Sequence, residues 1–212
     1  MKNIFSIHPI VISFMLAMGC AKQPPNTLDI LFEGDSDIEL WNTEEYPNSK
    51  NVGLGGDTCQ DVLDLLDTTL ASNPTQNVVL VCGENDFPDR SAYDTFVLFK
   101  SIVEKIHGSG AHVYYMGTKP EPDTTSLHQM YRDYDNFIKE YAIAHANTQS
   151  PYRLTVIDVY NGFVELDNPN ELYAEDQLHL SEAGYAYWNE WLQKAQNNSS
   201  CSIWRSGVCI HE

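Results

Sequence analysis

The segment Val78-Val79-Leu80-Val81-Cys82-Gly83-Glu84-Asn85-Asp86 decides the fold class of this 212-residue chain. Its first five residues are apolar and rich in β-branched side chains, which predicts a strand buried on both faces. A polar turn follows this strand directly. Weaker strand candidates occur at residues 28–32, 51–53, 113–116 and 154–157. The sequence therefore predicts a sheet of five strands.

Apolar residues at helical spacing separate the predicted strands. They form four stripes: Val62, Leu65, Leu66 and Leu70; Phe96, Phe99, Ile102, Val103 and Ile106; Leu127, Met130, Tyr131, Tyr134, Phe137, Ile138 and Tyr141; and Trp188, Trp191, Leu192 and Ala195. Ser181 is the predicted N-cap of the last helix. Alternating strands and helices indicate an α/β domain over residues 28–197, with a five-stranded parallel sheet in a three-layer, flavodoxin-like arrangement. In such sheets ligands bind at the carboxyl ends of the strands.

Four short motifs supply the parts of an ester hydrolase. They are Gly34-Asp35-Ser36, Gly55-Gly56-Asp57-Thr58, Gly83-Glu84-Asn85-Asp86 and Asp176-Gln177-Leu178-His179. A serine hydroxyl needs a neutral imidazole to accept its proton, and the imidazole needs a carboxylate that fixes its tautomer. Ser36, His179 and Asp176 fit these three roles. The N–H groups of Ser36 and Gly56 and the side-chain amide of Asn85 are candidate donors to the oxyanion of the intermediate.

In this order the motifs resemble the SGNH (GDSL) hydrolase family of lipases and esterases, and the resemblance extends from about residue 28 to residue 195. Segments 30–41 and 178–185 are similar to its platelet-activating-factor-acetylhydrolase-like and carbohydrate-esterase branches. The resemblance implies the catalytic roles named above, with no metal and no cofactor. Residues 37–39, Asp-Ile-Glu, stand where this family more often has small or hydroxyl residues, and the difference bears on substrate preference.

The first 19 residues have the pattern of a signal peptide. Lys2 precedes an apolar stretch that ends in Leu16-Ala17-Met18-Gly19-Cys20, which resembles the lipobox of bacterial lipoproteins. Cys20 is then the lipidated residue and residues 20–27 form a tether. The predicted location is the cell envelope, either periplasmic or on the cell surface, with the membrane reached only through the lipid. An ordinary secretory signal cleaved nearby is the alternative.

The other four cysteines also favour export. Cys201 and Cys209 bracket a short segment in the tail 198–212, which indicates a disulfide loop formed in an oxidising compartment. Cys59 and Cys82 lie near two motifs that should meet at one site. They are interpreted either as a second pair or as unpaired residues, with Cys82 buried in its strand.

Charge and loop composition restrict the partners of this protein. The net charge of −18 argues against nucleic acid and against electrostatic docking on anionic lipid. Loops 41–45 and 119–123 are short and polar, which favours a shallow cleft for a hydroxyl-rich alcohol. The predicted substrate is a short acyl ester, foremost acetyl, of a carbohydrate. A lysophospholipase or thioesterase, and an envelope lipoprotein that retains the fold without activity, are the alternatives.

Overall fold

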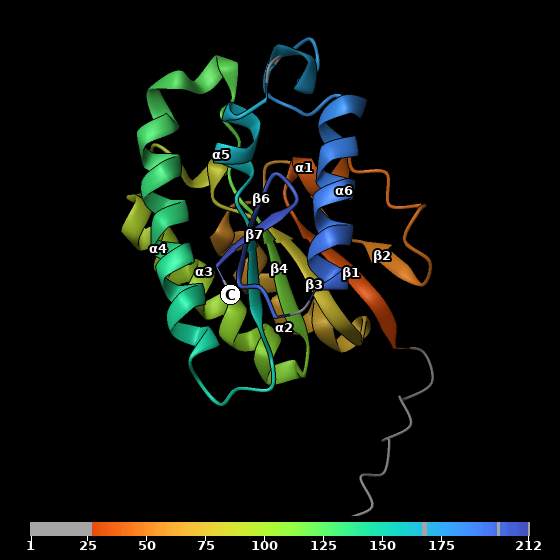
Figure 1. Cartoon of the computed structure of the whole chain (residues 1–212). Helices are drawn as coiled ribbons and strands as arrows, with labels where there is room; N and C mark the ends of the chain where they lie inside the picture. Colours follow the sequence, from red (N-terminus) through yellow and green to blue (C-terminus); the bar gives the residue numbers. More distant parts are fainter. Residues whose placement is uncertain (1–26, 167–168, 199, 212) are drawn as a thin grey trace, which may run out of the picture.

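A twisted sheet forms the centre of the computed structural model, which describes residues 27–166, 169–198 and 200–211 (Figure 1). The predicted signal peptide and Cys20 lie outside these residues. Within the described part the sheet has seven strands in the order β2-β1-β3-β4-β5-β6-β7. They are β1 (Leu28–Gly34), β2 (Ser49–Asn51), β3 (Thr75–Val81), β4 (His112–Met116), β5 (Leu154–Ile157), β6 (Ile203–Arg205) and β7 (Val208–His211).

The first five strands confirm the flavodoxin-like prediction. All are parallel, and their order in the sheet is β2-β1-β3-β4-β5. The chain therefore passes from β1 to β2 on one side of β1 and then crosses over to β3 on the other side. Gly34 pairs with Val81 at the carboxyl ends of β1 and β3. The segments that follow these two strands therefore start side by side at one edge of the sheet, which is the upper edge in Figure 1.

The prediction of only five strands is wrong, because the C-terminal tail belongs to the sheet. β6 pairs parallel with β5, and β7 pairs antiparallel with β6. Ser206 and Gly207 form the turn between them with φ of 50° and 70°, as tight hairpin turns require. Arg205 also donates to the buried carboxylate of Asp158 at 2.7 Å. A three-residue strand has too little alternation to be distinguished from a loop by sequence alone.

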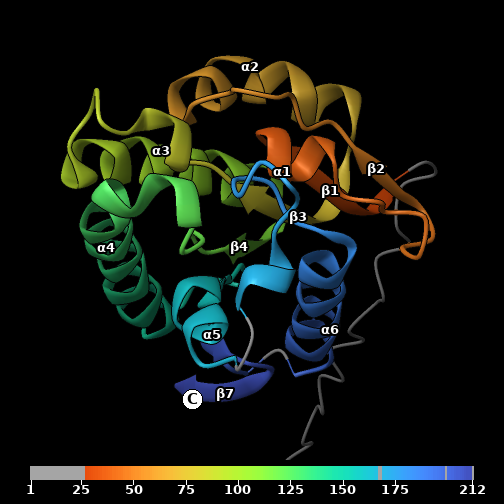
Figure 2. The ribbon, with the colours of Figure 1, turned by 90° about the horizontal axis from the view of Figure 1, so that it is seen from above.

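Helices cover both faces of the sheet (Figure 2). One face carries α2 (Cys59–Ser72), α3 (Ala92–Ser109) and α4 (His128–Ala146), and the other carries α5 (Val159–Val164) and α6 (Glu182–Asn197). The short α1 (Ser36–Glu39) lies at the end of β1. The 3-10 segments are η1 (Glu84–Asp86), η2 (Pro122–Leu127) and η3 (Pro169–Leu172).

The predicted stripes form the core with one exception. Phe99, Tyr134 and Trp188 are fully buried, whereas Leu65 of α2 is 55% exposed. Ser181 caps α6 by accepting from the Gly184 N–H, as predicted. Among the described residues, none of the helices combines the length and apolar character needed to cross a membrane.

Candidate active site

Ser36 lies at the junction of β1 and α1. Gly34 ends the strand, and a Cβ placed there would come within 2.1 Å of the Val81 carbonyl oxygen, so only glycine allows β1 and β3 to approach this closely. Asp35 is the N-cap of α1 and accepts from the Asp37 N–H at 3.0 Å, so it holds the turn that presents Ser36. In the first turn of a helix, the Ser36 N–H has no intrahelical acceptor.

His179 and Asp176 lie in the loop between η3 and α6, and they contact each other and Ser36. Asp176 Oδ2 lies 2.7 Å from His179 Nδ1, and His179 Nε2 lies 3.1 Å from Ser36 Oγ. Asp176 Oδ1 accepts the N–H groups of Leu178 and His179, each at 3.0 Å. The hydrogen bond from His179, with those two N–H groups, lowers the pKa of Asp176 to about 2.

The ionised Asp176 carboxylate can only accept a hydrogen bond, so it places the ring proton on Nδ1 of His179. Nε2 is then left as an acceptor facing the Ser36 hydroxyl. This is the tautomer that a general base must have to take the serine proton.

The two other predicted oxyanion donors lie on loops beside Ser36. Asn85 of η1 lines one cavity together with Ser36 and His179. Its Nδ2 donates to the Asp57 carbonyl oxygen at 3.1 Å, and one N–H of this amide remains for a ligand. Gly56 precedes Asp57 and has φ of +86°, a conformation that favours glycine. No protein atom lies within 4 Å of a Cβ placed at Gly56, so the backbone conformation rather than crowding within the protein accounts for this glycine.

A buried ionic cluster lies next to the nucleophile. Lys119, 2% exposed, places its Nζ 2.6 Å from Asp37, 2.5 Å from Glu84 and 2.7 Å from Glu121. Burial raises the pKa of Glu84 well above its usual range. In the case of Glu121, the Lys119 ammonium and hydrogen bonds outweigh burial and lower the pKa. Burial and the nearby charge of Asp37 raise the pKa of Asp35 to about 8.

Two hollows meet at His179. A cavity of about 200 Å³ contains Ser36, Asn85 and His179, and the Lys119 cluster also lines it. A more open hollow of about 640 Å³ has His179 and Asp176 at one side. Its other lining residues are Leu40, Asn42, Glu45, Ala174, Leu180, Glu182, Tyr185, Ala186 and Asn189.

The sequence prediction missed the cluster and misread two loops. Lys119, Glu121 and Trp41 were expected on polar loops that build the cleft, but all three side chains are buried. The only available signal for Lys119 was its position just after β4, at the same sheet edge as the motifs. Asp86 braces the Asn85 loop through Cys59, whose N–H donates to Asp86 Oδ2 at 2.8 Å.

Both cysteine pairs form disulfides in the structure. Cys201 is bonded to Cys209, as predicted, and Cys59 to Cys82, which resolves the alternatives left open by the sequence. His107, His112, His128, His145 and His211 take no part in the contacts around Ser36, and His8 lies outside the described residues. No group of potential metal ligands is found within the described part of the chain.

A family model for the GDSL-like lipase/acylhydrolase family matches residues 39–187. The chain belongs to this family. The match includes Asn85, Asp176 and His179, and it begins three residues after Ser36. Members of the GDSL-like family are serine esterases and acylhydrolases, so the chain is an ester hydrolase. Comparison with curated proteins gives no match.

Solved structures share the fold of this GDSL-like hydrolase. A protein from Bacteroides fragilis assigned as an acylhydrolase is 22% identical, with 84% of this chain and 91% of that chain covered and a TM-score of 0.68. A GDSL-like lipase from Bacteroides thetaiotaomicron is 19% identical, with coverages of 81% and 88% and a TM-score of 0.63. A variant of an acetyl-xylooligosaccharide esterase from a Geobacillus species is 16% identical, with coverages of 76% and 91% and a TM-score of 0.60.

Proposed function

We propose that Ser36, His179 and Asp176 catalyse the removal of a short acyl group, foremost acetyl, from a hydroxyl of a carbohydrate. The observation that carries this proposal is the continuous contact from Asp176 through His179 to Ser36, at 2.7 and 3.1 Å. Both are hydrogen-bond distances, and the second joins residues that are 143 positions apart in the chain.

The reaction has two halves. Ser36 Oγ attacks the ester carbonyl carbon while His179 Nε2 takes the hydroxyl proton, and the carbonyl oxygen becomes an oxyanion. The N–H groups of Ser36 and Gly56 and the Asn85 amide stabilise this oxyanion. The C–O bond to the alcohol then breaks, and the alcohol leaves with the proton from His179. Water, deprotonated by His179, attacks the acyl-enzyme, which releases the carboxylic acid and restores Ser36.

The small cavity supports a short acyl group. It has a volume of about 200 Å³, and Asp37, Glu84, Lys119 and Glu121 form part of its lining. An alkyl chain that extended into this cluster would displace water from charged groups without offering them hydrogen bonds, which is unfavourable. An acetyl group can bind beside Ser36 without reaching the cluster.

The larger hollow supports a polar alcohol. Asn42, Glu45, Glu182 and Asn189 supply amide and carboxylate groups, and Tyr185 supplies an aromatic ring. Such a lining offers hydrogen bonds to hydroxyls and repels anionic groups. The structural likeness to an acetyl-xylooligosaccharide esterase is consistent with an acetylated sugar.

A lipid-like or thioester substrate is the second candidate, because Leu40 is 54% exposed and lines the larger hollow together with Leu180. An apolar edge beside His179 can contact an alkyl chain. The same hollow would then hold a hydrophobic rather than a hydroxyl-rich group.

We also propose that the protein acts in the cell envelope after export, anchored through Cys20. The two disulfides support an oxidising compartment. Radioactive or click-labelled fatty acid should label the wild-type protein and not Cys20→Ser. Labelling of both proteins, or of neither, contradicts the anchor.

An acyl-length series tests the substrate proposal. Purified protein is assayed with p-nitrophenyl esters from acetyl to octanoyl, beside acetylated xylo-oligosaccharides and a lysophospholipid, with Ser36→Ala as the blank. We expect kcat/KM to fall with acyl length and acetate to be released from the sugar. A steady rise of kcat/KM from acetyl to octanoyl esters would favour the second candidate, a lipid-like or thioester substrate.

A further inference from the structure

We propose that the Cys59–Cys82 disulfide is a positioning element of the oxyanion hole, which fixes the distance between the loops that carry Gly56 and Asn85. This inference rests on the donor roles proposed above for those two residues. It goes beyond them because neither cysteine touches the substrate in the proposed reaction.

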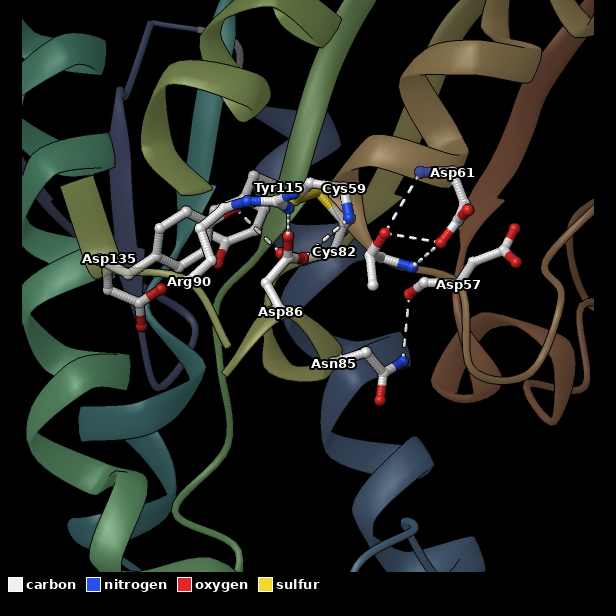
Figure 3. Close-up of a disulfide and its surroundings, with 11 residues drawn as sticks. Asp57, Cys59, Asp61, Cys82, Asn85, Asp86, Arg90, Tyr115 and Asp135 are labelled. Atoms are coloured by element: carbon white, nitrogen blue, oxygen red, sulfur yellow. Dashed lines mark hydrogen bonds and ion pairs between the residues drawn. A yellow bond between two sulfur atoms is a disulfide. The ribbon is translucent and has the colours of Figure 1, made fainter. Parts of the chain in front are cut away.

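The two cysteines occupy matching places on the two loops. Cys59 is three residues after Gly56 and begins α2, and Cys82 is three residues before Asn85 and follows β3. Figure 3 shows the disulfide with Asp57 and Asn85 on neighbouring segments. The bond therefore joins the two loops close to the point where each donor lies.

Two hydrogen bonds accompany this covalent link. Asn85 Nδ2 donates to the Asp57 carbonyl oxygen at 3.1 Å, and the Cys59 N–H donates to Asp86 Oδ2 at 2.8 Å (Figure 3). Asn85 is exposed, so water competes for its hydrogen bond. Arg90 pairs with the Asp86 carboxylate from the solvent side. Among the described residues, the disulfide is the one covalent connection between the two loops.

The core holds the disulfide itself rigidly. Cys59 is 0% exposed and Cys82 is 2% exposed. Tyr134 of α4 donates its hydroxyl to the Cys82 carbonyl oxygen at 3.0 Å, and its oxygen lies 3.4 Å from Cys59 Sγ. Movement of either sulfur would disturb this packed tyrosine. Because the two sulfur atoms are held in the core, the disulfide limits the movement of the two surface loops next to it.

The secondary structure does not depend on this bond in the same way. β3 is paired on both sides, with β1 and β4. α2 has its own capping box between Thr58 and Asp61, and it buries Val62 and Leu66. Loss of the disulfide should therefore leave these elements in place while the loop ends gain freedom. A misplacement of about 1 Å at a reacting centre can cost about 10²-fold in rate.

The chain contains a matched control in its second disulfide. Cys201–Cys209 closes the β6–β7 hairpin at the far edge of the sheet from β1 and β3. Neither of these cysteines lines the cavity that contains Ser36. Removal of either disulfide can lower the stability of the fold. Only removal of Cys59–Cys82 should displace the oxyanion donors.

The test compares Cys59→Ala/Cys82→Ala with Cys201→Ala/Cys209→Ala, using p-nitrophenyl acetate well below the unfolding temperature of each variant. We expect kcat to fall about 10-fold or more in the first pair, within the range for a displaced donor. KM should change less than about 2-fold because the oxyanion exists only in the transition state. The control pair should keep its kcat. Equal kcat in the two pairs would overturn the proposal.

A double-mutant cycle with Asn85→Ala separates positioning from general damage. If the disulfide acts through Asn85, its removal should cost clearly less in the Asn85→Ala background than in the wild type. The same fold-loss in both backgrounds contradicts the proposal.

Amide hydrogen exchange supplies a readout that needs no activity. Residues 53–58 and 83–86 should exchange at least about 10-fold faster without Cys59–Cys82, and α2 and β3 should not. Unchanged exchange in both loops would refute the inference. A wild-type protein without esterase activity would refute the proposed function alone, because exchange still decides the positioning role. If the alanine pair does not fold, Cys59→Val/Cys82→Val, which refills the core, replaces it.

Discussion

Asn85→Ala gives the most direct test of the proposed oxyanion hole. The substitution removes a side-chain amide that lines the cavity beside Ser36. One of its two N–H groups is used by the Asp57 carbonyl oxygen, and the other remains for the oxyanion. Ser36 and Gly56 keep their backbone N–H groups in the variant, so the reaction should be slowed rather than abolished.

The expected loss can be estimated from the number and exposure of the donors. Removal of one oxyanion donor typically lowers kcat by about 10²–10³-fold, which corresponds to about 2.7–4 kcal/mol. Asn85 is exposed and uncharged, and we therefore expect the lower end, a loss of about 10²-fold. KM should change less than about 3-fold, because the ester carbonyl carries full negative charge only after attack.

Steady-state kinetics on p-nitrophenyl acetate, with thermal unfolding measured in parallel, decides the matter. Asp89→Asn, an exposed substitution next to the same loop, is the matched control and should keep both constants. A rise in KM at constant kcat would make Asn85 a substrate-binding residue. If the free energy of unfolding falls by as much as the transition-state binding energy, Asn85 is a scaffold residue instead.

Other predictions concern the nucleophile, its base and a buried acid. Ser36→Ala should lower kcat about 10⁴-fold or more without unfolding, and EDTA should leave the wild-type rate unchanged; retained activity or inhibition by EDTA contradicts the mechanism. Asp176→Asn should lower kcat about 10³–10⁴-fold by favouring the wrong tautomer. Because the pKa of Asp176 is about 2, Asp176 stays ionised above about pH 4, and its protonation should not lower kcat/KM measured from pH 4 upwards. Burial raises the pKa of Glu33 from 4.5 to about 7, so the folded state holds the proton of this carboxyl more tightly than the unfolded chain does. This contribution of Glu33 to the free energy of unfolding is present below about pH 4 and is lost as the pH rises to about 7. Glu33→Gln should therefore stabilise the fold at pH 8 by up to about 3 kcal/mol and little at pH 4.5, with exposed Glu140→Gln as control; equal urea midpoints at pH 8 refute this.

Much of the fold and the proposed site could be predicted because the signals are local. β-Branched runs and helical stripes reveal strands and helices through their periodicity, and parallel strands bring their carboxyl ends to one edge. Ser36 and Asn85 follow β1 and β3, which are direct neighbours in the sheet. The motifs thus indicated both the chemistry and the place where it would assemble.

The sequence by itself determined the α/β class, the parallel order of the first five strands and the residues that meet around Ser36. Only the tertiary structure decided the burial of Lys119, the Cys59–Cys82 bond and the joining of the tail to the sheet. Lys119 and Asp37 are 82 positions apart, and nothing in the local pattern of either shows that it will be buried. A charged residue after a strand is usually solvated, and its burial depends on how many opposite charges other segments bring to it. Such contacts depend on the packing of the whole chain, which periodicity along a segment does not record.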